Sequence, residues 1–462
     1  MPNLKLSFIK RPLAKGESVC GIFERVRGKS AFLLHSSSGG RYSYVGYDPF
    51  AKVWSRGGVT EVAKLRDFAD WKKATGVRMF EGGPFRVLRD LTRHFQMNTV
   101  SPVPFSCGVA GYLSYDFGVK LDGIEQKVFD DLELPDFGFF FVDKLFVVDH
   151  ETSELYFVAV GATDSEAERK LETMENDLKT FPGVISTGTV GKMISNLTFE
   201  QYEQKLGAIR RHLEEGDTYQ VNFSQRFSGD CTRDPWEIYK VLSEKNSAPY
   251  SCFFDFGDFQ IISSSPELLL SKSGSKLVTK PIKGTAPRGR NASEDRQNIE
   301  RMLASPKEAA ELAMIVDLER NDFGKVCKPG SVRVVAHRDV EKYARVIHTV
   351  STVEGTILQN KDFFDAVGAV FPGGSITGCP KKRTMEIIDE LEDFRRGIYT
   401  GSAGFVGFDG NGVMNILIRT ILLLSGKLYY QVGGGVVIDS SARAEYDETF
   451  QKAKALEEVI GK

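Results

Sequence analysis

The N-terminal part of the chain carries many short stretches in which apolar residues are consecutive or alternate with polar ones. Residues 31–34, 109–113 and 139–148 are examples, and glycines interrupt the sequence between such stretches. Short runs of this kind between turn residues are typical of β-strands. Residues 165–181 are instead charged and have a helical pattern. We therefore expect a mostly antiparallel sheet with a few helices in this part of the chain.

A compositional break follows. Residues 182–192 are rich in Gly, Ser and Thr, which predicts a linker or an exposed hairpin. We place a boundary there, between an N-terminal region at 1–190 and a second region at 195–462. The chain has 462 residues, which exceeds the roughly 250–300 residues at which one hydrophobic core stops growing. Two domains, or one large interleaved domain, are expected.

The second region has clear helical and strand patterns. Thr198 and Gln201 have the spacing of a capping box, and apolar residues follow at helical spacing until Gly216. Residues 219–227 then alternate, which predicts a strand with Gln220 on its polar face. Two further strands are expected after it, at 251–256 and 259–263.

Composition and charge exclude several classes of function. Apolar residues make up 41% of the chain and charged residues 26%, as in an ordinary soluble globular protein. The net charge of −2 gives no basic surface for nucleic acid and no polybasic membrane signal. The N-terminus lacks the apolar core of a secretory signal, and no run approaches the roughly 18 apolar residues of a membrane span. The six cysteines form no CxxC pair, so we expect neither a disulfide framework nor a zinc site, and a reducing, cytoplasmic setting.

Two pairs of glutamates are spaced three residues apart on predicted helices. One helix begins at Ser305, and Glu308 and Glu311 share one of its faces. Glu445 and Glu448 repeat the arrangement on a predicted C-terminal helix. Carboxylates from two helices can hold Mg²⁺, which binds one or two of them together with water and substrate oxygens. Spacing alone, however, is more typical of a helix cap and three solvated acids.

Four further features suit a ligand, and each also has a structural explanation. Residues 371–382 place small residues before a predicted helix N-terminus, which attracts anions, although a well-capped turn gives the same pattern. The glycines at 433–435 weaken an apolar strand unless something approaches its backbone. Arg419, within an apolar strand at 414–425, needs an anionic partner, either an acid of the chain or a substrate carboxylate. His348 has the pattern of a satisfied core or edge histidine.

Lys283 lies between two residues that control the backbone. Pro281 removes a backbone donor, and Gly284 allows a turn or a close approach. A lysine that is held in place and desolvated can act as a nucleophile. Alone, the pentad Pro-Ile-Lys-Gly-Thr is more typical of a surface loop.

Taken in order, eight blocks of residues 195–462 resemble the chorismate-utilising enzymes, which include anthranilate, aminodeoxychorismate, isochorismate and salicylate synthases. The blocks are GDTYQVNFSQRF, SSSPELLL, PIKGTAPRGR, KEAAELAMIVDLERNDFGKVCKPGSV, HTVSTVEGT, FPGGSITGCPKKRTMEIIDELE, GIYTGSAGFVGF and AEYDETFQKAKAL. The N-terminal region matches more loosely, through LLHSS and GYLSYD. Cys379 departs from the alanine that is usual in its loop.

Two positions separate the members of this family. Isochorismate and salicylate synthases have a water-activating lysine where this chain has Gln220, which argues against water as the nucleophile. Anthranilate synthases usually have PIAGT, whereas aminodeoxychorismate synthases have PIKGT, as here. The resemblance therefore implies conversion of chorismate and ammonia to 4-amino-4-deoxychorismate, in the 4-aminobenzoate and folate pathway. An anthranilate synthase with an unusual lysine and a non-catalytic chorismate- or amino-acid-binding homologue remain as alternatives.

The resemblance also implies a role for each site residue. Lys283 would attack C2 of chorismate, Glu267 would protonate the leaving C4 hydroxyl, and His348 would assist. The residues that would line or hold the substrate are Gly284, Thr285, Tyr399, Arg419, Gly433, Gly435 and Gln220.

The cofactor implied by the resemblance is Mg²⁺. Glu311 and Glu448 would bind it directly, with Glu308 and Glu445 behind them. Ammonia would come from a separate glutamine amidotransferase subunit, because no glutaminase motif is legible in the chain.

The fold implied by the resemblance is a large α/β (α+β) body. Two antiparallel sheets would form a sandwich with flanking helices, strands of both regions would interleave, and the site would lie between the layers. Ser36, Tyr42 and Ser43 would line a pocket related to the tryptophan site of anthranilate synthases.

Overall fold

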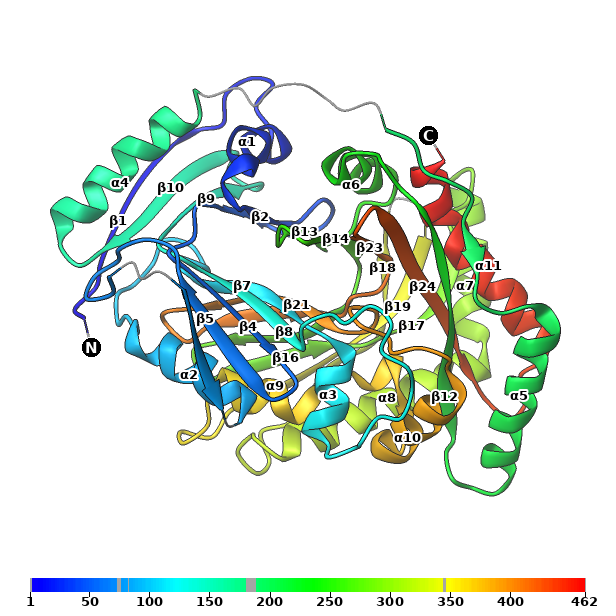
Figure 1. The fold of residues 1–462 in the computed structure, drawn as a ribbon. Coiled ribbons are helices and arrows are strands. Elements are labelled where there is room, and N and C mark those ends of the chain that lie inside the picture. Colours follow the sequence, from blue (N-terminus) through cyan, green and yellow to red (C-terminus); the bar gives the residue numbers. More distant parts are fainter. Residues whose placement is uncertain (1, 73–75, 82, 180–187, 344–345, 462) are drawn as a thin grey trace.

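Two large antiparallel sheets dominate the computed structural model, and helices flank them (Figure 1). The expected two-sheet α/β (α+β) architecture with flanking helices is confirmed. The structure describes residues 2–72, 76–81, 83–179, 188–343 and 346–461.

Each sheet combines strands from both sides of residue 190. In hydrogen-bonding order, the first sheet contains β1 (Lys5–Pro12), β10 (Glu154–Gly161), β9 (Lys144–Asp149), β3 (Tyr42–Gly46), β2 (Phe32–His35), β13 (Tyr250–Asp255), β14 (Phe259–Ser265), β23 (Thr420–Leu424), β24 (Lys427–Val436), β12 (Gln220–Asp230) and β11 (Ile194–Ser195), with β20 (Gly378–Cys379) paired to β12. The second contains β17 (Ile282–Pro287), β19 (Val346–Thr356), β16 (Lys276–Lys280), β15 (Leu268–Ser273), β22 (Gly412–Asn415), β21 (Ser402–Gly407), β7 (Gly108–Leu113), β8 (Phe137–Val142), β4 (Ala51–Arg56), β5 (Val59–Lys64) and β6 (Val77–Glu81), with β18 (Arg333–Lys342) paired to β19.

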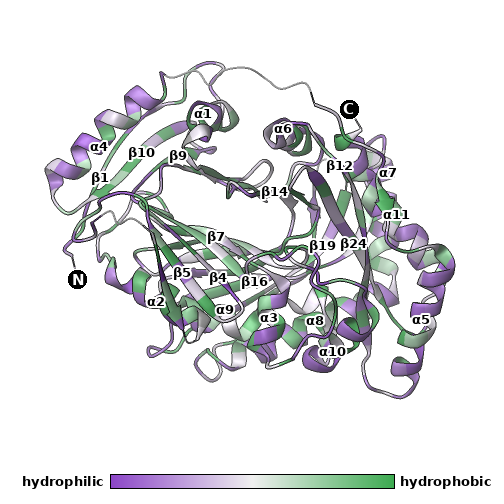
Figure 2. Cartoon of the chain, viewed as in Figure 1, coloured by the Kyte–Doolittle hydropathy of each residue, from purple (hydrophilic) through white to green (hydrophobic). Residues whose placement is uncertain are grey.

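The helices bury their apolar faces against these sheets. They are α1 (Val19–Val26), α2 (Pro84–His94), α3 (Tyr115–Leu121), α4 (Asp164–Asp177), α5 (Phe199–Glu214), α6 (Pro235–Lys245), α7 (Ala292–Ala304), α8 (Pro306–Gly324), α9 (Phe363–Val370), α10 (Lys381–Leu391) and α11 (Ala442–Ile460). Figure 2 shows the outer helices α4 and α5 as largely hydrophilic and the central strand β7 as largely hydrophobic. In the part of the chain that the structure describes, no helix combines the length and apolar content needed to cross a membrane.

A stack of phenylalanines joins the two sheets. Phe32 of the first sheet stacks on Phe140 of the second, with ring centroids 6.5 Å apart, and Phe140 stacks on Phe256 at 4.8 Å. Phe254 completes the stack against Phe32 at 5.5 Å. Burying each such ring contributes about 1.5–3 kcal/mol, so the shared core holds the N-terminal and C-terminal regions together.

Most predicted elements are present, with two corrections. The predicted strand at 414–425 is two strands, β22 and β23, because the chain leaves one sheet and enters the other between them. Arg419 lies at this crossing with a φ of +52°, outside either strand. Tyr219, predicted as the first residue of a strand, is 68% exposed and precedes β12. The predicted linker at 182–192 lies largely outside the described residues.

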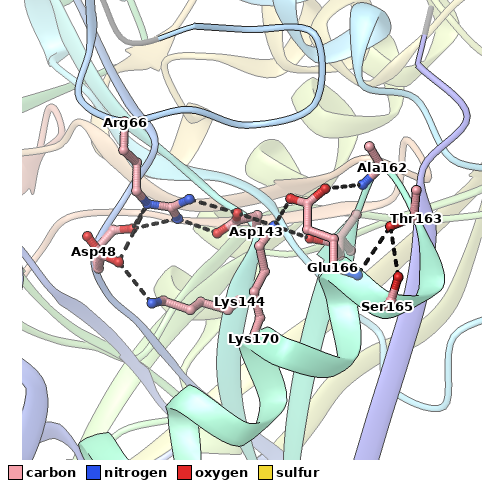
Figure 3. Close-up of polar contacts among 10 residues, drawn as sticks. Asp48, Arg66, Asp143, Lys144, Ala162, Thr163, Ser165, Glu166 and Lys170 are labelled. Carbon is pink, nitrogen blue, oxygen red and sulfur yellow. Dashed lines mark hydrogen bonds and ion pairs between the residues drawn. The ribbon is translucent and has the colours of Figure 1, made fainter.

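A buried ion-pair network ties the corner between β8 and β9 to α4 (Figure 3). Asp143 is fully buried and accepts a hydrogen bond from Arg66 Nη1 at 2.9 Å. Lys170 of α4 lies 2.8 Å from the same carboxylate. Burial raises the pKa of Asp143, but these two cations outweigh it, so the pKa is lowered. The corner at which the chain passes between the sheets is thereby fixed by charge.

Candidate active site

Lys283 lies in an irregular strand that depends on a glycine. β17 pairs with β19, with Lys283 opposite Thr349, and the register shifts between Lys283 and Thr285. Gly284, within this shift, has a φ of +75°, and a Cβ atom there would lie 2.6 Å from Glu308 Oε2 and 2.7 Å from Thr349 Oγ1. Glycine is therefore needed at this position, and it lets Glu308 of α8 approach the strand that carries Lys283.

The amine of Lys283 is surrounded by charges of both signs. Burial lowers its pKa, and the positive charge of Lys452 acts in the same direction. The carboxylates of Glu311, Glu267 and Glu448 oppose this effect, yet the pKa stays below the ordinary value of a lysine. A larger fraction of the amine is therefore neutral than in an exposed lysine, as a nucleophilic lysine requires.

Glu267 is a buried carboxyl group just before β15. Its side chain accepts a hydrogen bond from the backbone N–H of Ile282 at 3.2 Å, and the residue is 3% exposed. Burial raises the pKa of Glu267, and the Ser375 hydroxyl and the charges of Lys283 and Arg419 offset only part of that rise. A carboxyl group with a raised pKa retains its proton to higher pH, which suits a general acid.

His348 of β19, which is buried, pairs with the half-buried Arg419 beside β17. Arg419 Nη2 lies 3.1 Å from His348 Nε2, and His348 Nδ1 lies 3.1 Å from Thr285 Oγ1. Burial and the charge of Arg419 lower the pKa of His348 to about 3. The neutral ring adds no second positive charge beside Arg419, and it carries no negative charge that would neutralise the guanidinium, so Arg419 stays available to an anionic group.

The four predicted metal ligands come from α8 and α11, and their charges influence one another. Burial, Glu311 and Glu448 raise the pKa of Glu308, whose buried Oε2 has no hydrogen-bond partner among the described residues. Burial and Glu448 likewise raise the pKa of Glu445. Burial also acts to raise the pKa of Glu448, but the positive charges of lysines, Lys452 foremost, leave it lowered. These oxygens are the ligands that a hard divalent cation prefers.

The four glutamates influence one another electrostatically, but in the described part of the chain they are not gathered to ligating distance. In the described part of the chain, the group with three ligand atoms within 4.8 Å of one another is His212, Glu215 and Asp217, at the end of α5. Asp217 there already accepts a hydrogen bond from Arg383 at 2.8 Å. The positive charge of Arg383 therefore already neutralises part of that cluster. Glu308 Oε2, by contrast, has no partner among the described residues.

The paired strands β12 and β24 form a second wall. Gln220 is fully buried, and neither its Oε1 nor its Nε2 has a partner among the described residues. A Cβ atom on Gly435 would lie 2.5 Å from Gln220 Nε2, and one on Gly433 would lie 2.5 Å from the backbone of β12. Tyr399 is also buried, and the Arg396 guanidinium lies 5.6 Å from its ring. Gly433 and Gly435 thus allow β12 and the Gln220 side chain to approach the backbone of β24 closely, as the glycine pattern indicated.

Two residues near the site were missed by the sequence analysis. Lys452 donates a hydrogen bond to Gly433 O at 2.8 Å and forms an ion pair with Glu448, also at 2.8 Å. The i, i+4 spacing of Glu448 and Lys452 is a signal that could have revealed this pair. Ser375, whose hydroxyl lowers the pKa of Glu267, lies in the stretch 371–382 that the sequence singled out, but its effect on Glu267 depends on tertiary packing that no sequence pattern reports.

A separate cavity lies beside β17, the strand that carries Lys283. It has a volume of about 260 Å³, and its lining includes Tyr250, Lys280, Ile282 and Tyr343. Lys283 is not among the lining residues. The serines expected in a tryptophan-like pocket are not part of it either: the Ser36 hydroxyl donates to Pro249 O, and the Ser43 hydroxyl bonds His150. That pocket stays a prediction.

Comparison with known proteins places this geometry in a family. Residues 30–458 match the chorismate binding enzymes. The chain belongs to this family. It is 41% identical to aminodeoxychorismate synthase component 1 of Bacillus subtilis over 94% of this chain and 92% of that protein.

Relatives that are named for a different activity are also similar to this member of the chorismate-utilising family. It is 36% identical to an anthranilate synthase component 1 of Haloarcula marismortui, over 95% of this chain and 89% of that protein. The crystal structure of anthranilate synthase component I from Streptococcus pneumoniae superposes with a TM-score of 0.79 at 30% identity, covering 92% of this chain and 93% of that one. Similarity supports the family without separating these two activities.

Proposed function

We propose that this chorismate-utilising enzyme is an aminodeoxychorismate synthase component I that forms 4-amino-4-deoxychorismate from chorismate and ammonia. The observation that carries the proposal is Lys283, an amine of lowered pKa on a bulged strand beside Glu267 and Glu311. The relative from Bacillus subtilis that bears this name is consistent with it.

The first step uses Lys283 and Glu267, whose shifted pKa values suit them to it. Neutral Lys283 attacks C2 of chorismate and forms a C–N bond while the ring double bonds shift. The C4–O bond breaks, and Glu267 gives its proton to the leaving hydroxyl, which departs as water. Ammonia then attacks C4, the double bonds shift back, and the bond between Lys283 and C2 breaks. The enolpyruvyl group stays intact throughout.

Gln220 helps to decide which nucleophile completes the reaction. An amide cannot take a proton from water as an amine can, so Gln220 provides no base for hydroxide formation. Its buried and unpartnered amide can instead hydrogen-bond to ammonia or to the substrate. We further propose that ammonia is delivered by a separate glutamine amidotransferase subunit.

The donor set fits Mg²⁺. Burial and the neighbouring carboxylates raise the pKa values of Glu308 and Glu445, and Glu308 Oε2 lacks a partner among the described residues. Glu311 and Glu448 would bind the ion, with Glu308 and Glu445 behind them. Bound there, Mg²⁺ would supply positive charge for the ring carboxylate of chorismate. Arg419 and Tyr399 would hold the enolpyruvyl carboxylate.

Product analysis of the purified protein tests the proposal. We expect chorismate, MgCl₂ and ammonium chloride to give a product that becomes 4-aminobenzoate only after an aminodeoxychorismate lyase is added. Fluorescent anthranilate and pyruvate formed without the lyase would instead assign an anthranilate synthase. No turnover under either condition would leave a binding homologue as the function.

A further inference from the structure

Glu319 is a buried carboxyl group that the proposed reaction does not use. It lies on α8 and is 2% exposed. Its Oε1 accepts a hydrogen bond from the backbone N–H of Gly374 at 3.4 Å, and its Oε2 has no partner in the described part of the chain. Burial raises the pKa of Glu319 to about 8, against the opposing charge of Lys381. The group is therefore neutral below that pH, while Lys381 is bonded to Asp322 at 2.6 Å.

A tight turn connects Glu319 to the general acid. The turn Gly374–Ile376 packs directly on α8, since a Cβ atom on Gly374 would lie 2.6 Å from Leu318 Cδ2 and 3.5 Å from Glu319 Oε1. Ser375 follows Gly374, is buried, and lowers the pKa of Glu267 through its hydroxyl. Its Oγ has no hydrogen bond of good geometry among the described residues. The turn also borders the segment that carries Glu267, since a Cβ atom on Gly373 would lie 2.9 Å from Ile416 Cδ1, and the Ile416 N–H donates to Glu267 O at 3.0 Å. Glu319 and Glu267 thus lie on two sides of the same turn.

Packing alone does not explain an acid at this position. A buried polar oxygen without a partner costs free energy, and an apolar side chain of similar length would avoid that cost. We infer that Glu319 is a positioning residue for Glu267: its carboxyl group holds the Gly374–Ser375 turn so that the Ser375 hydroxyl faces the acid. The inference rests on the proposed function in that Glu267 acts as the general acid.

Two replacements of Glu319 separate positioning from packing. Glu319→Gln keeps a neutral side chain of the same shape that can accept from Gly374 N–H, and we expect its kcat to stay within about twofold of wild type. Glu319→Met removes the acceptor. We expect its kcat to fall on the order of tenfold, within the roughly hundredfold that a 1 Å misplacement costs. The KM for chorismate and the Tm of Glu319→Met should stay close to wild type, because neither the substrate contacts nor the core is lost.

The double variant with Ser375→Ala shows whether Glu319 acts through the turn. If it does, Glu319→Met adds little to the loss in kcat caused by Ser375→Ala alone. Three results would overturn the inference: wild-type kcat in Glu319→Met, losses that multiply in the double variant, or a loss in kcat accompanied by a lower Tm. The product made by the wild-type enzyme decides the proposed function separately, since these ratios can be measured for 4-amino-4-deoxychorismate or anthranilate alike.

Discussion

Arg419 donates a hydrogen bond to His348, with Nη2 and Nε2 3.1 Å apart. Arginine can only donate, so Nε2 is the unprotonated nitrogen of the ring. Nδ1 then carries the hydrogen and can donate to Gly284 O, 3.2 Å away. The pair therefore fixes one neutral tautomer and aligns it with the strand that carries Lys283.

The first prediction concerns the protonation of His348. Its pKa is lowered to about 3, whereas an unfolded histidine titrates near pH 6.5. The unfolded state therefore binds an extra proton between these values, so this contribution to stability is complete above about pH 6.5 and is lost progressively toward pH 3. The nitrogen shifts of His348 should stay constant from pH 5 to 8, and a titration near pH 6.5 would contradict the lowered pKa.

Gly284→Ala should damage both folding and activity. The new Cβ atom would lie 2.6 Å from Glu308 Oε2 on a backbone of positive φ. We expect a loss of about 1–3 kcal/mol in the free energy of unfolding, together with loss of turnover. Gly274→Ala is the matched control, because Gly274 also has a positive φ, of +56°, but nothing lies within 4 Å of its Cβ position. It should cost about 1–2 kcal/mol and leave kcat unchanged.

Lys283 should form a covalent adduct with the substrate. When ammonia is omitted, mass spectrometry of the quenched enzyme should find added mass on the peptide that contains Lys283. Because its pKa is lowered, the adduct should form at a pH below the ordinary lysine value of about 10.4 and increase as pH rises. Lys283→Ala should lose the adduct. Lys280→Ala should retain it, since Lys280 pairs with Glu341 instead, and an unmodified Lys283 during turnover would rule out the covalent step.

Removal of divalent metal should stop turnover. We expect EDTA to abolish activity, Mg²⁺ to restore it, and Glu448→Gln or Glu311→Gln to weaken Mg²⁺ binding in calorimetry, because each removes a negative ligand. Glu203→Gln serves as the control, since Glu203 is exposed on α5 and is not on either of the helices that carry the four glutamates. Activity that survives metal removal would refute this assignment of the four glutamates.

Asp143→Asn should destabilise the fold without touching the site. The change leaves Arg66 and Lys170 without their shared buried carboxylate, and breaking a buried pair costs about 3–5 kcal/mol. The lowered pKa of Asp143 means that its contribution is complete above the ordinary pKa of aspartate and is lost as pH falls through the native value. Asp67→Asn, which removes an exposed partner of Lys72, should cost at most about 1 kcal/mol in the same denaturation experiment.

The sequence determined the local elements and the kinds of chemistry. Capping patterns at Thr198 and Ser305 placed helices correctly, because capping depends on residues a few positions apart. The prediction of one strand at 414–425 was wrong. Residues on both sides of the crossing between the two sheets are buried and apolar, so their sequence resembles one continuous strand. Block order identified the family, and the prediction of aminodeoxychorismate synthesis within it rests on Gln220 and the PIKGT pentad.

Tertiary structure alone decided how those residues act on one another. Whether burial or the carboxylates would set the pKa of Lys283 depends on distances between β17, α8 and α11, and burial prevails. The contact between Arg419 and His348 and the turn that connects Glu319 to Glu267 join segments far apart in the chain. A sequence pattern reports which residues are neighbours along the chain. The pKa and the orientation of a side chain depend instead on its neighbours in space, and the packing of the two sheets determines those neighbours.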